Sequence, residues 1–366
     1  MVPFTWLGLA LLLCLVPLTT SVDSNIVSDT EAYPLPNQGN IITHDPSIIQ
    51  VNGYYYLFMG GVHIPVHKAA NLDGPWEYIG TVLAGPSEID KVNRTRPWAP
   101  MTIEWNNRFY CFYCISDTGR RDSAIGVATS DSIAGTWTDH GVLINTGEGD
   151  LAHIYPYNVS NAIDPAFFAD PLTGTPYLQY GSFWDGIFQL RLDPTTLTID
   201  HPAHPDSTHL IYVPEPRKPE EGSFMSYKAP YYYLWFSHGK CCQFSRGFPP
   251  MGAEYSIRVG RSTSVHGPFT DKQGTDLLGG GGTVVYGSNH GVVYAPGGVG
   301  VLTGSGGESD VLYYHYRMYL LATLPRYSIG FEDKVRVYSD DTASGCFLDF
   351  ADGSSKRAWD GATSST

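Results

Sequence analysis

Three acidic residues stand at the start of three similar segments of the chain. Asp45 and Asp164 each precede a proline and a short apolar run, and Glu221 precedes Gly-Ser-Phe. Carboxylates that share one pocket move apart in pKa, so one can serve as an acid and another as a base. Aromatic residues near these segments offer flat faces for sugar rings: Trp98, Phe183 and Trp184. This combination indicates glycoside hydrolysis, with a calcium site built from the same carboxylates as the alternative.

The three segments belong to a repeat that returns about every 55–75 residues. Each copy has an acidic or Ala-Pro start, a few apolar residues, a turn and an aromatic strand. The five copies start at Asp45, Trp98, Asp164, Glu221 and Tyr294. Repeats with several short strands are typical of propeller blades, so we predict an all-β, five-bladed β-propeller. The first strand of each blade lines the channel, which would gather the acids around one axis. A β-sandwich or two unrelated β domains are the alternatives.

The composition supports many short strands and tight turns. The 366 residues include 25 Tyr, 40 Gly and 26 Pro, and only 16% of them are charged. Such residues favour strands and turns, which argues against a helical bundle or coiled coil. The hydrophobic share of 42% excludes general disorder. The net charge of −14 argues against a nucleic-acid or anionic-membrane partner, because both need a basic face.

The first 22 residues have the character of a secretory signal peptide. Their apolar stretch from Phe4 to Leu18 is roughly 15 residues long, short of the ~20 that span a bilayer. No second hydrophobic segment of spanning length follows, so we predict a secreted, extracellular protein without a membrane partner. Residues 23–366 would form a single propeller domain. Two sequons, at Asn93 and Asn158, predict a glycoprotein.

Five of the six cysteines remain after the signal peptide. Cys111 and Cys114 would lie roughly 10 Å apart in one strand, too far to bridge. The adjacent Cys241 and Cys242 either form a vicinal disulfide or face two ways. We interpret none of the cysteines as a metal ligand. Five histidines have loose ligand-like spacings, but their flanking prolines indicate loops: His63, His67, His201, His204 and His209.

Longer motifs resemble those of glycoside hydrolase family 43, and within it the endo-1,5-α-L-arabinanases of fungi and bacteria. In family order these are Thr43–Ser47, Trp98–Pro100, Ser123–Val127, Asn161–Pro165, Tyr180–Trp184, Glu221–Phe224, Tyr231–Leu234, Cys241–Cys242, Gly260–Ser262 and Tyr313–Tyr316. The Asn-Ala-Ile-Asp-Pro and Gly-Ser-Phe-Trp blocks together are specific. The resemblance implies a five-bladed propeller and inverting hydrolysis of internal α-1,5 bonds in arabinan, a side chain of plant cell-wall pectin. It also implies no organic cofactor and a monomeric enzyme.

The resemblance carries roles onto individual residues. Asp45 matches the general base that activates water, and Glu221 matches the general acid that protonates the leaving oxygen. Asp164 matches a third acid that orients the general acid and raises its pKa. His315 matches a histidine near the axis that takes part in a metal site, usually calcium, with water filling most of the shell. Residues expected to bind sugar are Trp98, Gly126, Asn161, Ala162, Ile163, Ser182, Phe183 and Trp184.

Three features depart from the family pattern. Met101 stands where family members usually carry Asp after Trp-Ala-Pro. Residues 147–159 look like an insertion near the cleft, and a blocked cleft would favour an exo-acting arabinofuranosidase or β-xylosidase. Residues 317–366 do not match the family's completion of blade five. An incomplete blade would favour a non-catalytic sugar-binding propeller, whereas the three intact acids favour an enzyme.

Overall fold

The computed structural model describes residues 41–244, 247–288, 293–304, 310–318 and 333–338. Two compact units divide the chain, Met1–Tyr33 and Pro34–Thr366, and every described residue belongs to the second. The expected signal peptide, residues 1–22, lies outside the described residues, as does most of the atypical segment 317–366. No helix among the described residues is long and apolar enough to cross a membrane.

Antiparallel strands make up five sheets, each with its strands in sequence order. The first holds β1 (Ser47–Val51), β2 (Tyr54–Phe58), β3 (Pro65–Ala69) and β4 (Glu77–Thr81). The second holds β5 (Trp98–Trp105), β6 (Arg108–Ile115), β7 (Ala124–Ser130) and β8 (Thr138–Asn145). The third holds β9 (Ala166–Ala169), β10 (Pro176–Tyr180), β11 (Ile187–Arg191) and β12 (Ser207–Ile211). The fourth holds β13 (Glu220–Lys228), β14 (Tyr231–His238), β15 (Ser256–Ser262) and β16 (Thr283–Tyr286).

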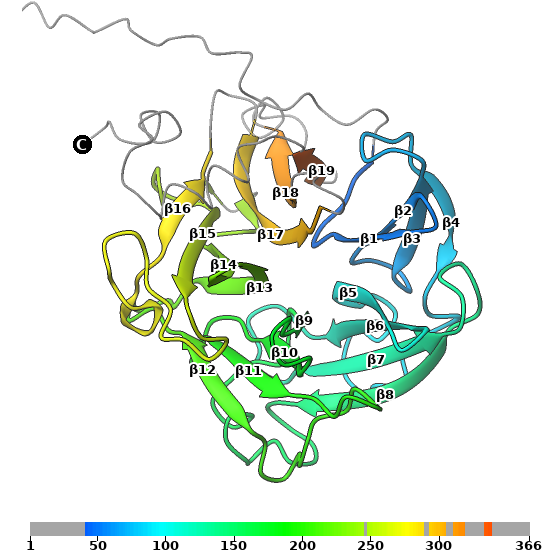
Figure 1. The fold of residues 1–366 in the computed structure, drawn as a ribbon, viewed down its shortest axis with the longest axis horizontal. Helices are drawn as coiled ribbons and strands as arrows, with labels where there is room; N and C mark the ends of the chain where they lie inside the picture. The colour runs from blue at the N-terminus through cyan, green and yellow to red at the C-terminus, as the bar shows by residue number, and fades with distance from the viewer. Residues whose placement is uncertain (1–40, 245–246, 289–292, 305–309, 319–332, 339–366) are drawn as a thin grey trace, which may run out of the picture. The chain divides into compact units, whose positions relative to one another are not determined.

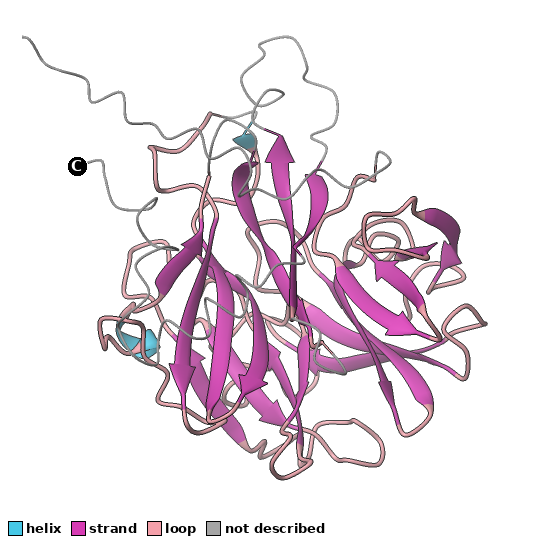
Figure 2. Ribbon diagram, turned by 45° about the horizontal axis from the view of Figure 1, so that its top comes forward, coloured by secondary structure: helices cyan, strands magenta, loops and turns pink. Residues whose placement is uncertain are grey.

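The fifth sheet has three described strands, β17 (Val293–Leu302), β18 (Val311–Met318) and β19 (Asp333–Tyr338). A short 3₁₀ helix, η2 (Leu277–Gly279), precedes β16, and strands otherwise dominate the described regular structure (Figure 2). The first strands form a closed cycle of contacts: β1 packs against β5 and β17, β9 against β5 and β13, and β13 against β17 (Figure 1). This arrangement confirms the predicted all-β propeller. The described residues complete four blades of four strands each and give the fifth sheet three strands.

The hairpins follow directly from local turn chemistry. Asn52 and Gly53 join β1 to β2 with φ values of 51° and 77°, and Asn106 and Asn107 join β5 to β6 with φ values of 50° and 61°. Two positive φ angles in a row define the tight turn whose twist matches that of the flanking strands. Asn and Gly reach this conformation with little strain, so these pairs fix the register of both hairpins.

Apolar side chains fill the spaces between neighbouring sheets. Phe112 of β6 is fully buried and stacks on Phe167 of β9, with ring centroids 6.3 Å apart. One large cluster joins the second and third sheets in this way, and another joins the third and fourth. Burying an aromatic side chain contributes about 1.5–3 kcal/mol, so these clusters bind each blade to the next. The sheets therefore present their first strands to one channel in a fixed arrangement.

Four blades begin with the same unusual backbone. Asp45, Ala99, Asp164 and Ala295 each precede a proline and have φ values of 46°, 41°, 57° and 51°. In blade four, Gly222 has a φ of 58° directly after Glu221. A left-handed residue before proline is disfavoured, and such strain is typical of sites where the surrounding structure requires it. Register shifts follow the entry in β5, β13 and β17, so the chain bends as it enters the channel.

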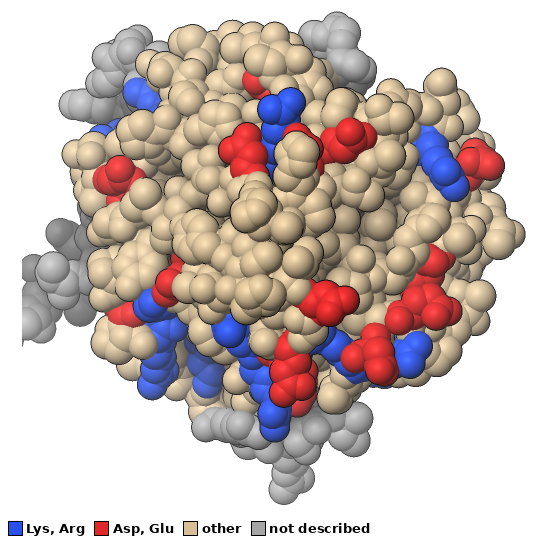
Figure 3. All heavy atoms as spheres, turned by 90° about the horizontal axis from the view of Figure 1, so that it is seen from below, with Lys and Arg blue, Asp and Glu red and all other residues tan. Residues whose placement is uncertain are grey.

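Charged side chains are sparse on the surface. On the face that Figure 3 shows, acidic and basic residues are interspersed, and most of the area belongs to neither kind. The charged side chains on this face therefore do not form one large patch of a single sign.

Gly126 lies inside the second sheet, where the chain approaches its neighbours closely. A Cβ atom there would stand 2.7 Å from the Gly141 carbonyl oxygen and 2.8 Å from Ile89 Cδ1. Contacts this short require the neighbours to shift. Packing alone therefore explains glycine at this position, which was expected to bind sugar.

We predict that Gly126→Ala lowers the free energy of unfolding by about 1–3 kcal/mol, because the added methyl overpacks the sheet. Denaturant unfolding measures this change. Gly85→Ala is the matched control, because no atom lies within 4 Å of a Cβ placed there. Equal stability of the two variants would contradict the packing explanation.

Candidate active site

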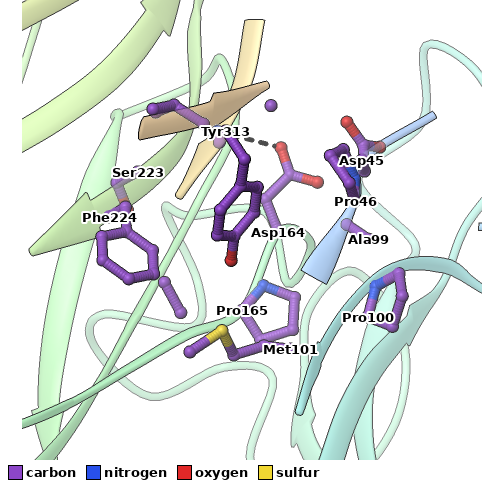
Figure 4. A pocket seen from close by; sticks show the side chains of 14 residues that line it. Asp45, Pro46, Ala99, Pro100, Met101, Asp164, Pro165, Ser223, Phe224 and Tyr313 are labelled. Atoms are coloured by element: carbon purple, nitrogen blue, oxygen red, sulfur yellow. Dashed lines mark hydrogen bonds between the residues drawn. The ribbon is translucent and has the colours of Figure 1, made fainter. Parts of the chain in front are cut away.

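A pocket opens where the blades meet, and every blade contributes to its lining. The lining comes from the blade entries: Asp45, Pro46, Ala99, Pro100, Met101, Asp164, Pro165, Ala166, Gly222, Ser223, Phe224, Gly298 and Val299, with Tyr313 from β18. Figure 4 shows the side chains of Asp45, Asp164 and Tyr313 around this pocket. The repeat thus predicted correctly that the blade starts meet in one place. Glu221 does not line the pocket itself but precedes Gly222, which does.

Glu221 is buried, and hydroxyl groups hold both of its carboxyl oxygens. Ser182 Oγ donates to Oε2 at 2.6 Å, and the Tyr255 hydroxyl donates to Oε1 at 2.9 Å. Burial raises the pKa of Glu221, and the negative charge of Asp45 raises it further. The two hydrogen bonds act in the opposite direction, because donors favour the ionised form. The outcome is a carboxyl group that keeps its proton to a higher pH than usual.

Asp164 stands at the third blade entry and contacts the backbone next to Glu221. Its Oδ2 accepts a hydrogen bond of 3.1 Å from the backbone N–H of Gly222, which Figure 4 marks with a dashed line. Burial raises the pKa of Asp164 well above its usual range, and repulsion by Glu221 and Asp45 adds to the effect. Two close carboxyl groups cannot readily both ionise, so Asp164 and Glu221 titrate as a pair.

Asp45 lies between two histidines. The distance from His44 Nε2 to Asp45 Oδ2 is 3.6 Å, and from His315 Nδ1 to Asp45 Oδ1 it is 3.4 Å. The backbone N–H of Asp45 also donates to His315 Nδ1 at 3.1 Å, and the two imidazole rings stack 4.2 Å apart. One nitrogen or oxygen from each of these three residues lies within 4.8 Å of the others. Among the described residues this is the one group of three or more His, Cys, Asp or Glu close enough to share a metal ion.

Two glycines of β17 allow these side chains to lie close together. A Cβ on Gly297 would stand 2.0 Å from the ring of Tyr255, and a Cβ on Gly298 would stand 2.6 Å from His315 Nδ1. Any larger residue would displace the groups next to Asp45 and Glu221. The fifth sheet therefore helps to shape the site, although Asp45, Asp164 and Glu221 all belong to other blades.

The expected sugar-binding residues fall into two groups. Asn161, Ala162 and Ile163 lead into Asp164, and Ser182, Phe183 and Trp184 form a turn beside Glu221. The backbone N–H of Phe183 donates to the Glu220 carbonyl at 2.9 Å, which fixes this turn against β13.

Trp98 and Gly126 belong to neither of these two groups. Trp98 is half-buried and packs against the cluster between the second and third sheets, and Gly126 lies within its own sheet. None of the eight expected sugar-binding residues lines the pocket itself; the first group adjoins it through Asp164 and the second through Glu221.

Segment 147–159 is packed onto the propeller. Arg121 Nη1 donates to the Tyr157 carbonyl at 2.9 Å, and Tyr157 is buried between the second and third sheets. Tyr155 is 54% exposed and meets Phe188 edge-on. Met101, which stands where the family motif has Asp, lines the pocket.

The cysteine interpretations are resolved by the structure. Cys241 and Cys242 form a vicinal disulfide, and Cys111 and Cys114 are free and buried, as their spacing predicted.

The two sequons differ in their surroundings. Asn93 is exposed, but its side-chain Nδ2 donates to the Ser116 carbonyl at 2.9 Å. Asn158 is exposed, and the hydroxyl of Ser160 in the same sequon is buried against Tyr180 at 2.9 Å.

Sequence reasoning missed His44 and Tyr255. His44 directly precedes Asp45, so its place in the cluster could have been inferred from the blade start. Tyr255 precedes β15, outside the repeated blade entries, and no local pattern connects it with Glu221.

The comparisons with known proteins concern the family and the fold of the chain. Residues 39–332 match the family model described as Glycosyl hydrolases family 43. A relative from Emericella nidulans, named "Probable arabinan endo-1,5-alpha-L-arabinosidase D", is 58% identical over 360 residues, which cover 96% of this chain and 91% of the relative. An alignment over 96% of the chain must include part of residues 317–366.

Solved structures of bacterial proteins share the fold. The GH43 endo-arabinanase from Bacillus licheniformis has a TM-score of 0.69 and 29% identity, covering 83% of this chain and 96% of its own. The Cellvibrio cellulosa α-L-arabinanase complexed with arabinohexaose has a TM-score of 0.68 and 26% identity, covering 82% and 92%.

Glu220 is a second buried acid beside the site, on the opposite face of β13 from Glu221. Its Oε1 accepts a hydrogen bond of 3.4 Å from the backbone N–H of Val213, and its Oε2 has no hydrogen-bond partner among the described residues. Burial raises the pKa of Glu220 to about 8. In the unfolded chain a glutamate titrates near pH 4.3, so folding favours its protonated form. Its stabilising contribution is complete below about pH 4.3 and is lost as the pH rises through about 8.

We predict that Glu220→Gln becomes more stable relative to the wild type as the pH rises from 5 to 8. The glutamine carbonyl keeps the bond from Val213 but cannot ionise, and a gain of roughly 2–4 °C in Tm at pH 8 is expected. Thermal unfolding of both proteins across this pH range measures the effect. A Tm difference that does not change with pH would contradict it.

Proposed function

The chain belongs to the glycosyl hydrolases of family 43, and on that premise we propose that it hydrolyses internal α-1,5 bonds of arabinan. The observation that carries this proposal is the meeting of Asp45, Asp164 and Glu221 from three blade entries at one site. The named arabinosidase relative and the arabinohexaose complex of a structural relative support arabinan as the substrate.

The proposed reaction inverts the configuration at the anomeric carbon. Glu221 gives its proton to the glycosidic oxygen as the bond from that oxygen to the anomeric carbon breaks. A water molecule attacks the same carbon from the opposite face and gives a proton to Asp45. Asp164 fixes the backbone after Glu221 through Gly222, while burial and repulsion by Asp45 keep the acid protonated. This division of roles agrees with the raised pKa of Glu221.

Sugar binding is proposed for the segments beside the acids. Asn161 is buried, and its Oδ1 has no hydrogen-bond partner among the described residues, so it can accept a bond from a sugar hydroxyl. Phe183 and Trp184 are half-buried in a turn with φ values of 55° and 43°, which directs them out of the regular sheet. Their rings are suited to stacking on arabinose units.

We also propose a calcium ion near His44, Asp45 and His315. Three acids surround this region, none of the described pocket-lining residues is Lys or Arg, and a cation would offset that negative charge. The donor set fits an ion that keeps several water ligands, because calcium prefers six to eight oxygen atoms and the protein offers few here. When bound, the ion would supply positive charge beside the acids.

The cellular location of the protein and its domain architecture are proposed from different observations. Residues 1–22 are proposed to direct secretion, and the disulfide between Cys241 and Cys242 is typical of an oxidising compartment. Exposed Asn158 is the favoured glycosylation site. Residues 23–366 are proposed to form one monomeric, five-bladed domain, since β17 closes the cycle of contacts with β1.

We predict that Glu221→Gln lowers turnover of debranched linear arabinan by roughly 10²–10⁴-fold, because positioned acid catalysis is lost. Glu220→Gln is the matched control, since it makes the same change one residue earlier. The wild type should release mixed oligosaccharides early in the reaction. Chromatography of products over time measures both effects. Release of arabinose alone from the start would overturn the endo assignment and favour exo action, and equal rates in the two variants would overturn the acid assignment.

We predict that dialysis against EDTA lowers both the calcium content and the activity, and that added calcium restores them. His315→Ala should bind less calcium at equal protein concentration. Metal analysis by mass spectrometry gives this readout without reference to activity. Equal calcium content in His315→Ala and the wild type would contradict the proposed site.

A further inference from the structure

Tyr255 makes a contact with Glu221 that the roles above leave unexplained. Its hydroxyl donates to Glu221 Oε1 at 2.9 Å in a buried position, while Ser182 donates to the other oxygen at 2.6 Å. Hydroxyl donors thus hold both oxygens of the Glu221 carboxyl group, and Tyr255 is one of the two.

The Tyr255 ring is fixed from several directions. Its backbone N–H donates to the Lys240 carbonyl at 3.0 Å, which ties it to the chain just after β14. Its ring stacks on that of His315 at a centroid distance of 6.0 Å, and Gly297 lies against it so closely that no Cβ would fit. Gly222, the residue after Glu221, lies near the same hydroxyl. The ring therefore cannot turn away from Glu221 without moving β17 or the channel entry of β13.

We propose that Tyr255 is a positioning residue for Glu221, aiming its carboxyl group and stabilising the carboxylate that remains after the proton has left. This inference rests on the proposed function of Glu221 as the acid. Tyr255 itself does not exchange a proton with the substrate.

The proton balance explains why such a donor accelerates the reaction. The proton of Glu221 moves to the glycosidic oxygen, the bond from that oxygen to the anomeric carbon breaks, and the carboxylate gains a negative charge. A hydrogen bond to a charged acceptor is about twice as strong as one to a neutral acceptor. The bond from Tyr255 therefore strengthens as the charge develops, which lowers the barrier.

Other groups around Glu221 also affect how readily it ionises. Asp45 disfavours a negative charge on Glu221, and His44 favours it. Asp164 is itself raised in pKa by burial and by repulsion from Glu221 and Asp45. Ser182 is the second hydroxyl donor. These groups stay in place when Tyr255 loses only its hydroxyl, so a change in that variant reports on this hydroxyl, which also has a hydrogen bond with Ser237.

The test is Tyr255→Phe, which keeps the ring and its packing but removes the donor. Loss of a hydrogen bond to a charged group should lower kcat on linear arabinan by roughly tenfold or more. The ionised form of Glu221 loses support, so its pKa rises. Because the acid works in its protonated form, the basic limb of the pH–kcat profile should move up by about one pH unit. Ser182→Ala should move the limb in the same direction.

Tyr232→Phe is the matched control. Tyr232 also donates from a buried position to a carboxylate, Asp170, at 2.7 Å, but it lies in the cluster between the third and fourth sheets. It should lose stability while the pH profile stays unchanged. Thermal unfolding shows whether each variant is folded at the assay temperature.

The outcomes separate this inference from the proposed function. The proposed role of Tyr255 is overturned if Tyr255→Phe and Tyr232→Phe show the same pH profile and the same small loss of rate. The proposed function stays intact in that case as long as the wild type is active and Glu221→Gln is inactive. A wild type without activity on arabinan would overturn the function first. If Tyr255→Phe does not fold, Ser182→Ala becomes the test variant, because it removes the other donor to the same carboxyl group. An unshifted basic limb in the pH–kcat profile of Ser182→Ala counts against the proposal.

Discussion

The structure depends on a backbone constraint at the entry of each blade. At four entries a residue with left-handed φ precedes a proline, and at the fourth blade Gly222 takes that conformation after Glu221. The bend places the start of each first strand against the common pocket. A disfavoured conformation persists only where its surroundings enforce it, and here the packing between neighbouring sheets supplies that support. The same bend that positions Asp45 and Asp164 occurs at Ala99 and Ala295, so the scaffold is shared and the chemistry depends on which side chain stands there.

Gathering acids at one place creates the electrostatic conditions for catalysis. Burial and mutual repulsion favour the protonated forms of Asp164 and Glu221, while Ser182, Tyr255 and the backbone of Gly222 favour the ionised ones. These opposing effects act on both groups at once, so Asp164 and Glu221 titrate as a pair.

Much of this site could be predicted from the sequence, because the repeat relates residues that are far apart in the chain. Asp45, Asp164 and Glu221 occupy similar positions in similar units, and closure of the sheets brings those positions together. Tyr255 could not be found in this way, since its contact with Glu221 depends on the path of a loop and on the absence of a side chain at Gly297. Gly126 belongs to a motif found near the site, and its close contacts with Gly141, Ile89 and Tyr113 account for a glycine there by packing alone. The completeness of blade five stayed open, because residues 317–366 do not match the family's completion of that blade.

The disulfide between Cys241 and Cys242 has a practical consequence for production of the protein. It directly follows Lys240, whose carbonyl accepts the backbone hydrogen bond of Tyr255. A reducing cytosol keeps such cysteines as thiols. Protein made in the cytosol of a bacterial host would thus differ from secreted protein in the loop that supports the acid, although both have the same sequence. Yeast secretion or export to the bacterial periplasm is therefore the appropriate route, and titration of free thiols would serve as a quality criterion for each preparation.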